Sequence, residues 1–160
     1  MKKRILAVLM TAILAVSLTA CGGGETNETA AEKNDFKVGL VTDVGGVEYQ
    51  SFNQSAWEGL CRAEEEFGIT VNYLASTTDA DYAPNIETFI DEEYDLIICV
   101  GYMLAEATRT AAEANPDQMF AIVDDSSCSD LDNVACLMFK QEQASYLVGY
   151  VAGMMTEKDK

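Results

Sequence analysis

The sequence predicts an α/β domain in which a parallel sheet is flanked by helices. From Phe36 onward, short apolar runs typical of strands alternate with longer segments whose apolar residues recur at helical spacing. Such alternation favours a parallel sheet with helices on its faces. Hydrophobic residues make up 49% of the 160 residues and charged residues 23%, so the chain has enough apolar material for one packed core, and disorder as the main state is excluded.

Five segments have the pattern of strands. They are residues 37–42, 69–74, 96–100, 119–123 and 133–139. The third is a continuous apolar run bounded by Asp95 and Gly101, which is typical of a buried parallel strand. The first and fourth strands end at acidic residues, Asp43 and Asp124.

Four segments have helical periodicity. They are residues 52–67, 82–93, 103–114 and 141–155. The first follows Ser51-Phe-Asn-Gln54, which has the spacing of a capping box, and it ends before Gly68. The third ends before Asn115-Pro116. In the last helix we interpret Gly149 and Gly153 as sites of close packing on the sheet, because the apolar stretch is too short to span a membrane as a G-x-x-x-G dimer.

The N-terminal residues have the layout of a secretory signal. Residues 2–4 are basic, and the apolar run 5–16 is shorter than the roughly 20 residues of a spanning helix. Leu18-Thr19-Ala20-Cys21 resembles the lipobox of bacterial lipoproteins, in which the cysteine receives a diacylglycerol after cleavage. We therefore expect a lipoprotein signal peptide at residues 1–20 and lipidation of Cys21. A plain signal peptide and a short membrane anchor are the alternatives.

A tether and an acidic domain follow the signal. Residues 21–35 have no aromatic residue and no apolar periodicity, so we expect a flexible tether from the lipid to a folded domain at residues 36–160. The formal net charge is -17. A chain this acidic repels phosphate backbones and anionic headgroups, so we expect no nucleic-acid binding and attachment to the membrane through the lipid alone.

The composition also excludes several kinds of chemistry. The sequence has no histidine, which removes the Ser-His and Cys-His nucleophile pairs and every His-containing zinc site. Gly45-Gly46 belongs to no phosphate-binding motif, and Glu48 beside it would oppose a phosphate. Residues 126–132 are acidic but lack the spacing of a calcium loop. We predict no catalytic residue, no metal and no cofactor.

Four cysteines remain once Cys21 is assigned to the lipid. Cys61 lies on a predicted helix, and Cys99 and Cys136 lie in predicted strands, where a buried thiol behaves as a small hydrophobic group. An exported protein could instead join Cys128 to Cys136 in a disulfide, and this alternative stays open.

The predicted fold indicates where a ligand would bind. In sheets of this kind ligands lie at the carboxyl ends of the strands. Asp43, Gly101-Tyr102 and Asp124 follow three of the predicted strands, so polar groups gather at that edge. Acidic residues at strand ends also cap helices and turns, which is the structural alternative.

Five segments resemble one family when they are taken together. They are V-G-L-V-T-D-V-G-G (38–46), S-F-N-Q-S-A-W-E-G-L (51–60), V-G-Y (100–102), N-P-D-Q-M-F-A-I-V-D (115–124) and N-V-A-C-L-M-F-K-Q-E-Q-A-S-Y-L-V-G-Y-V-A-G (133–153). This series resembles the basic-membrane-protein family of lipoproteins, the purine-nucleoside receptors that feed ABC importers. The resemblance implies a type I periplasmic-binding-protein fold, with the nucleoside between two lobes. Members are about twice as long, so we expect the N-terminal lobe here.

The resemblance also implies roles for individual residues. Phe52 would stack on the purine and Asn53 would hydrogen-bond its edge, while Asp43 and Asp124 would accept hydrogen bonds from the ribose hydroxyls. Gly101-Tyr102 would lie near the ligand. The structural alternatives are that Phe52 packs on the first helix and that Asn53 caps it.

The predicted function is that of a non-enzymatic binding protein, anchored by lipid on the outer side of a bacterial cytoplasmic membrane. Its partners would be a small-molecule ligand, expected to be a purine nucleoside, and the permease subunits of an ABC importer. The alternatives are a protein that binds a sugar or another small solute, a surface antigen or adhesion module, and an exported hydrolase.

Overall fold

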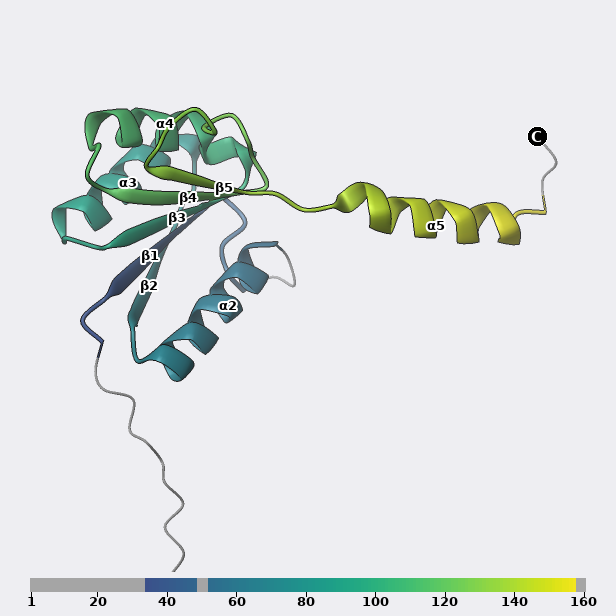
Figure 1. The fold of residues 1–160 in the computed structure, drawn as a ribbon, viewed down its shortest axis with the longest axis horizontal. Helices are drawn as coiled ribbons and strands as arrows, with labels where there is room; N and C mark the ends of the chain where they lie inside the picture. The colour runs from purple at the N-terminus through teal and green to yellow at the C-terminus, as the bar shows by residue number, and fades with distance from the viewer. Residues whose placement is uncertain (1–33, 49–51, 158–160) are drawn as a thin grey trace, which may run out of the picture. The chain divides into compact units, whose positions relative to one another are not determined.

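The computed structural model describes residues 34–48 and 52–157, and its centre is a five-stranded sheet (Figure 1). All neighbouring strands are parallel, in the order β2-β1-β3-β4-β5. The strands are β1 (Lys37–Thr42), β2 (Thr70–Ala75), β3 (Leu96–Val100), β4 (Met119–Val123) and β5 (Val134–Leu137). The predicted signal peptide, almost all of the predicted tether and the predicted capping residue Ser51 lie outside the described residues.

The described helices connect and follow these strands. They are α2 (Phe52–Phe67), α3 (Tyr82–Asp91), α4 (Ala105–Ala114) and α5 (Gln141–Met155), with short 3-10 turns η1 (Asp79–Asp81) and η2 (Tyr102–Leu104). Every predicted strand and helix is present, and the prediction of a parallel sheet flanked by helices is confirmed. Four elements differ from the prediction at their ends: β2 begins and ends one residue later, α3 ends two residues earlier, α4 begins two residues later, after η2, and β5 is shorter at both ends. Among the described helices, none is long and apolar enough to cross a bilayer.

The helices lie in two layers around the sheet. α3 and α4 cover one face, and α2 covers part of the other (Figure 1). The larger core lies under α3 and α4 and includes Ile86, Phe89 and Phe120. The smaller core contains Leu40 and Val100, against which the side chains of α2 pack. This division follows from the pleat, since successive residues of a strand point to opposite faces.

The prediction that α5 packs closely on the sheet is wrong for the described residues. A Cβ atom built at Gly149 or Gly153 would meet no atom within 4 Å. Every residue of α5 is exposed, including Tyr146 and Leu147. A helix buries its apolar side only against another layer. No described element provides such a layer for α5, so helical spacing predicted the helix but not its environment.

Candidate functional site

Three predicted site residues lie in one row at the carboxyl edge of the sheet. Asp43, Gly101 and Asp124 each follow one of the adjacent strands β1, β3 and β4. The β1–β3 register, extended by two residues, sets Asp43 beside Gly101, and the β3–β4 register, extended by one residue, sets Gly101 beside Asp124. Neighbouring strands are about 4.8 Å apart, so the backbones that carry the two carboxylates are separated by about 10 Å. The sheet therefore places one carboxyl group on each side of Gly101.

Gly101 keeps the space between these carboxylates open. Its φ of +94° lies in a region that side chains rarely adopt, and a Cβ atom added there would meet nothing within 4 Å. The next residue, Tyr102, is 72% exposed in η2. A ligand group could therefore approach the backbone at this point without displacing a side chain of the described residues.

Asp43 is held in place by its neighbours. Its Oδ1 atom accepts a hydrogen bond from Asn53 Nδ2 at 2.7 Å and another from the backbone N–H of Gly45 at 3.0 Å. Asn53 is only 4% exposed, because it lies at the start of α2 beneath this turn. The hydrogen bond from Asn53 therefore orients the Asp43 carboxylate. The predicted contact of Asn53 with a purine stays a prediction.

Phe52 lies at the same end of the sheet with part of its ring in the open. The side chain is 42% exposed, and its ring meets that of Phe139 edge to face, with centroids 5.7 Å apart. Both rings border an apolar cavity of about 330 Å³ between α2 and the sheet. Its other lining residues are Leu40, Ser55, Ala56, Gly59, Leu60, Ile98, Val123 and Leu137. Phe52 therefore contacts Phe139 and still presents ring surface for stacking.

Asp124 has an unusual backbone conformation. Its φ is +62°, which few residues other than glycine adopt but which aspartate and asparagine tolerate better than most. Its backbone N–H donates to the carbonyl of Leu137 at 2.9 Å, so the conformation is fixed between β4 and β5. Its side chain is exposed. An exposed carboxylate in a fixed, uncommon conformation at a strand end is typical of functional sites.

A set of polar groups that follow β2 was not predicted from the sequence. Ser76 is buried one residue beyond β2, and its backbone N–H donates to the carbonyl of Thr42 at 3.3 Å. Asn85 Nδ2 in turn donates to Ser76 Oγ at 3.0 Å. Tyr82, at the start of α3, is 4% exposed. Ligands lie at the carboxyl ends of strands, so this segment could have been predicted from its position. It was missed because β2 is followed by Ser76 and not by an acidic residue.

Among the described residues, no salt bridge joins Asp43 or Asp124 to a cation. Arg109 pairs with Asp130 at 2.5 Å and with Glu113 at 3.3 Å, and these partners raise its pKa further above its usual value. Lys37 lies at the start of β1 with its Nζ atom 5.0 Å from the ring centre of Tyr94. The site can thus accept hydrogen bonds from an uncharged, hydroxyl-rich ligand, whereas it would repel a phosphate.

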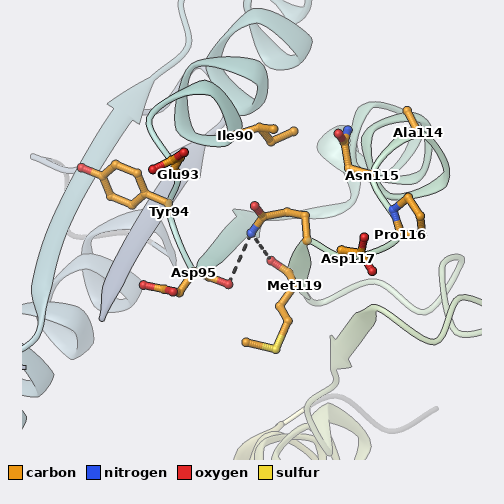
Figure 2. A pocket seen from close by; sticks show the side chains of 10 residues that line it. Ile90, Glu93, Tyr94, Asp95, Ala114, Asn115, Pro116, Asp117 and Met119 are labelled. Atoms are coloured by element: carbon orange, nitrogen blue, oxygen red, sulfur yellow. Dashed lines mark hydrogen bonds between the residues drawn. The ribbon is translucent and has the colours of Figure 1, made fainter. Parts of the chain in front are cut away.

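A larger cavity, of about 700 Å³, lies at the opposite edge of the sheet (Figure 2). It opens between the turns that lead into β3 and β4, where Gln118 Nε2 donates to the carbonyls of Asp95 and Met119 at 3.3 and 3.1 Å. None of the predicted site residues lines it. The carboxyl edge remains the candidate site, because ligands of parallel α/β sheets bind there.

The cysteines of the described residues are free thiols. Cys99 is fully buried in β3, and burial raises its pKa to about 12, so it does not form a reactive thiolate. Burial likewise raises the pKa of Cys136. Cys128 and Cys136 are not joined, so the disulfide alternative is not realised. Within the described ranges, no three His, Cys, Asp or Glu side chains are grouped so that they could hold a metal ion.

Several curated relatives match the chain along its whole length. The "CD4+ T-cell-stimulating antigen" of Listeria innocua is 42% identical, and the chain covers 47% of that protein. The "ABC transporter nucleoside-binding protein BmpA" of Lactococcus lactis is 37% identical, and the chain again covers 47% of it. The chain thus spans about half the length of the curated relatives that it matches.

A solved structure and a family description agree with these relatives. The crystal structure of ABC transporter system solute-binding proteins from Aeropyrum pernix matches 73% of this chain and 32% of its own, with a TM-score of 0.68 and 33% identity. The family described as "ABC transporter substrate-binding protein PnrA-like" matches residues 36–160. The chain therefore belongs to the Bmp family of PnrA-like ABC transporter substrate-binding proteins, as its motifs predict.

Proposed function

We propose that this chain is the N-terminal lobe of a lipid-anchored protein that captures purine nucleosides for an ABC importer. The observation that carries the proposal is the carboxyl edge of the sheet. There, Asp43 and Asp124 flank the open space over Gly101, and the partly exposed ring of Phe52 belongs to the same end of the sheet.

A nucleoside suits the chemistry of these groups. Its ribose hydroxyls are donors that match carboxylate acceptors, and charged acceptors form the stronger hydrogen bonds. Its base is a flat aromatic surface, and stacking on an aromatic side chain is worth about 1–3 kcal/mol per base in single-strand binders. The nucleoside itself has no charge, so the carboxylates need no cation to balance it. The name of the Lactococcus lactis relative, a nucleoside-binding protein, points to the same class of ligand.

The complete site would need a second lobe. The chain covers 47% of the relatives described above, so a protein of their length has as much sequence again. In the proposed arrangement the described sheet supplies one wall of the cleft and the second lobe supplies the other. Closure around the nucleoside would then present the loaded protein to the permease subunits.

A thermal-shift panel on the full-length protein tests the ligand class. We expect inosine, guanosine or adenosine to raise the melting temperature, because a ligand that binds only the folded state stabilises it by mass action. Ribose alone should have little effect, since it lacks the base that stacks on Phe52. Stabilisation by ribose or another sugar, with no response to the three nucleosides, would replace this proposal by the sugar-binding alternative.

The lipid anchor is a separate part of the proposal and rests on the sequence around Cys21. Replacing Cys21 with alanine removes the thiol that would carry the lipid. The wild type should partition with membranes and incorporate a labelled fatty acid, and the Cys21→Ala variant should do neither. Equal membrane association and no label in both proteins would contradict lipidation.

A further inference from the structure

The β4–β5 loop, residues 125–133, is tied to α4 by one arginine. Arg109 of α4 pairs its two terminal guanidinium nitrogens with the two carboxylate oxygens of Asp130, at 2.5 and 3.1 Å. The same guanidinium donates a hydrogen bond to the backbone carbonyl of Ser127. A forked pair between arginine and a carboxylate has a fixed geometry, which single exposed ion pairs rarely have. The loop is therefore attached to α4 at two points.

Two further contacts connect this attachment to Asp124. The Oδ1 atom of Asp125 accepts hydrogen bonds from the backbone N–H of Ser127, at 2.7 Å, and from the Ser127 hydroxyl. Asp125 directly follows Asp124, so the chain leaves Asp124 into a turn closed by these bonds. Beneath the turn, Cys128 is fully buried, and its thiol donates to the carbonyl of Ala105 at 3.7 Å. The turn thus has a fixed position beside the start of α4.

Asp124 needs a constraint on both of its sides. Its φ of +62° is unfavourable for a residue with a side chain, and such conformations persist only where the surrounding structure imposes them. The hydrogen bond from its N–H to Leu137 fixes the side toward β4, and the turn held by Arg109 fixes the other side. We propose that Arg109 and Asp130 are positioning residues of the site, which hold the β4–β5 loop so that the Asp124 carboxylate keeps the orientation that the ligand needs. This inference rests on the proposed nucleoside-binding function.

The test compares the two carboxylates that pair with Arg109, in the full-length protein, with inosine as the probe and calorimetry as the measurement. Asp130→Asn breaks the pair with the loop and should weaken inosine binding about three- to tenfold, the size of an effect passed through neighbouring contacts. Glu113→Gln is the matched control, because it breaks the 3.3 Å pair within α4 and leaves the loop attached, so inosine binding should not change. Arg109→Lys keeps the charge but not the fork, so it should behave as Asp130→Asn does.

A double-mutant cycle measures whether the effect passes through Asp124. In an Asp124→Asn background the carboxylate that the loop positions is absent, so Asp130→Asn should weaken inosine binding by at most about 1.5-fold further. Backbone hydrogen exchange tests the attachment without a ligand. The N–H of Ser129, which donates to the carbonyl of Ser126 at 3.2 Å, should exchange faster in Asp130→Asn than in Glu113→Gln.

Four results would overturn this inference. Equal inosine affinities of the wild type and Asp130→Asn, or equal losses in Asp130→Asn and Glu113→Gln, would show that the attached loop does not position the site. A loss that is the same with Asp124 and with Asn at that position would show that the effect does not pass through Asp124. Unchanged exchange at Ser129 would show that Arg109 does not hold the loop. A wild type that binds no nucleoside would overturn the proposed function and this inference together.

Discussion

At the scale of single residues, the carboxyl groups of the site are held by quite different means. Asp43 is oriented by hydrogen bonds from Asn53 and Gly45. Asp124 is oriented by its backbone, whose φ of +62° is fixed between two strands. The two residues can therefore be tested by different substitutions, and asparagine is the informative replacement at Asp124 because it tolerates the same backbone conformation.

Asp124→Asn should leave the fold intact and weaken inosine binding by about 10- to 100-fold. The reason is that hydrogen bonds to a charged acceptor are worth about 1.5–3 kcal/mol, and the amide keeps the shape of the side chain but not its charge. Calorimetry on the full-length protein measures the effect. Asp117→Asn at the opposite edge of the sheet is the control and should bind as the wild type does. Unchanged affinity in Asp124→Asn would remove this residue from the site.

The sequence indicated the positions of the candidate residues more reliably than the contacts that they make. Asp43, Gly101 and Asp124 could be placed at the carboxyl edge because strand ends are visible in the apolar pattern. The bond from Asn53 to Asp43 could not be predicted, since it depends on how the turn after β1 meets α2. The burial of Tyr82 was missed for the same reason, because a tyrosine at a helix start gives no sign of how deeply it lies in the core.

At the scale of elements, the start of α3 is fixed by one carboxylate. The Oδ2 atom of Asp81 accepts hydrogen bonds from the hydroxyl of Thr77 at 2.6 Å and from the backbone N–H groups of Thr77 and Thr78 at 2.9 and 2.8 Å. These bonds, led by the Thr77 hydroxyl, lower the pKa of Asp81 from 3.8 to about 2. The segment that leads into Tyr82 is therefore held by an ionised aspartate.

This arrangement predicts a pH dependence of stability. A carboxyl group whose pKa is lower in the folded state stabilises the fold above its unfolded pKa, and this contribution disappears as the pH falls toward the folded value. The stability that Asp81 provides should thus be lost between about pH 4 and pH 2. In denaturant unfolding at a series of pH values, the free energy of unfolding should decrease less steeply with falling pH for Asp81→Asn than for the wild type. The same slope in both proteins would contradict the prediction, and Asp79→Asn, in the same 3-10 turn, serves as the control.

The packing of α3 on β1 gives a second prediction at this scale. A Cβ atom at Gly39 would come within 2.6 Å of the Phe89 ring, so Gly39→Ala should destabilise the protein by about 1–3 kcal/mol through overpacking. Gly59 in α2 is the control, because a Cβ atom there meets nothing within 4 Å and alanine favours the helix by about 0.5–1 kcal/mol. In denaturant unfolding, the free energy of unfolding should fall for Gly39→Ala and rise for Gly59→Ala. An equally stable Gly39→Ala would show that α3 does not pack this closely.

For α5, local sequence patterns predicted the helix but not its exposure. Its periodicity and its bounds were correct, because helical spacing is a property of the segment itself. Its burial was not, because burial depends on a layer that none of the described elements supplies. In the proposed two-lobed protein, that layer would come from the second lobe.

At the scale of the whole molecule, the fold could be predicted almost completely, and the ligand only by resemblance. The alternation of apolar runs and helical segments determines a parallel sheet with helices on its faces, since few other arrangements bury both. The strand order and the half-covered second face could not be predicted, because they depend on which strands pair. The ligand class depends on a cleft whose second wall is not part of the described chain.

The charge of the molecule constrains the ligand independently of the fold. The formal net charge is -17, and neither Asp43 nor Asp124 has a cationic partner among the described residues. A phosphate brought to this edge would face two carboxylates across a short distance, which is unfavourable even at the surface of a protein. The proposed site should therefore discriminate between a nucleoside and its monophosphate.

The most direct test of this account is calorimetric titration of the full-length protein with inosine and, separately, with inosine monophosphate. We expect saturable binding of inosine and at least about 100-fold weaker binding of the monophosphate, because the repulsion of one phosphate by two carboxylates at an effective dielectric constant of 20 amounts to several kcal/mol. Equal binding of the two ligands, or binding of neither, would contradict the assignment of this carboxyl edge as a nucleoside site.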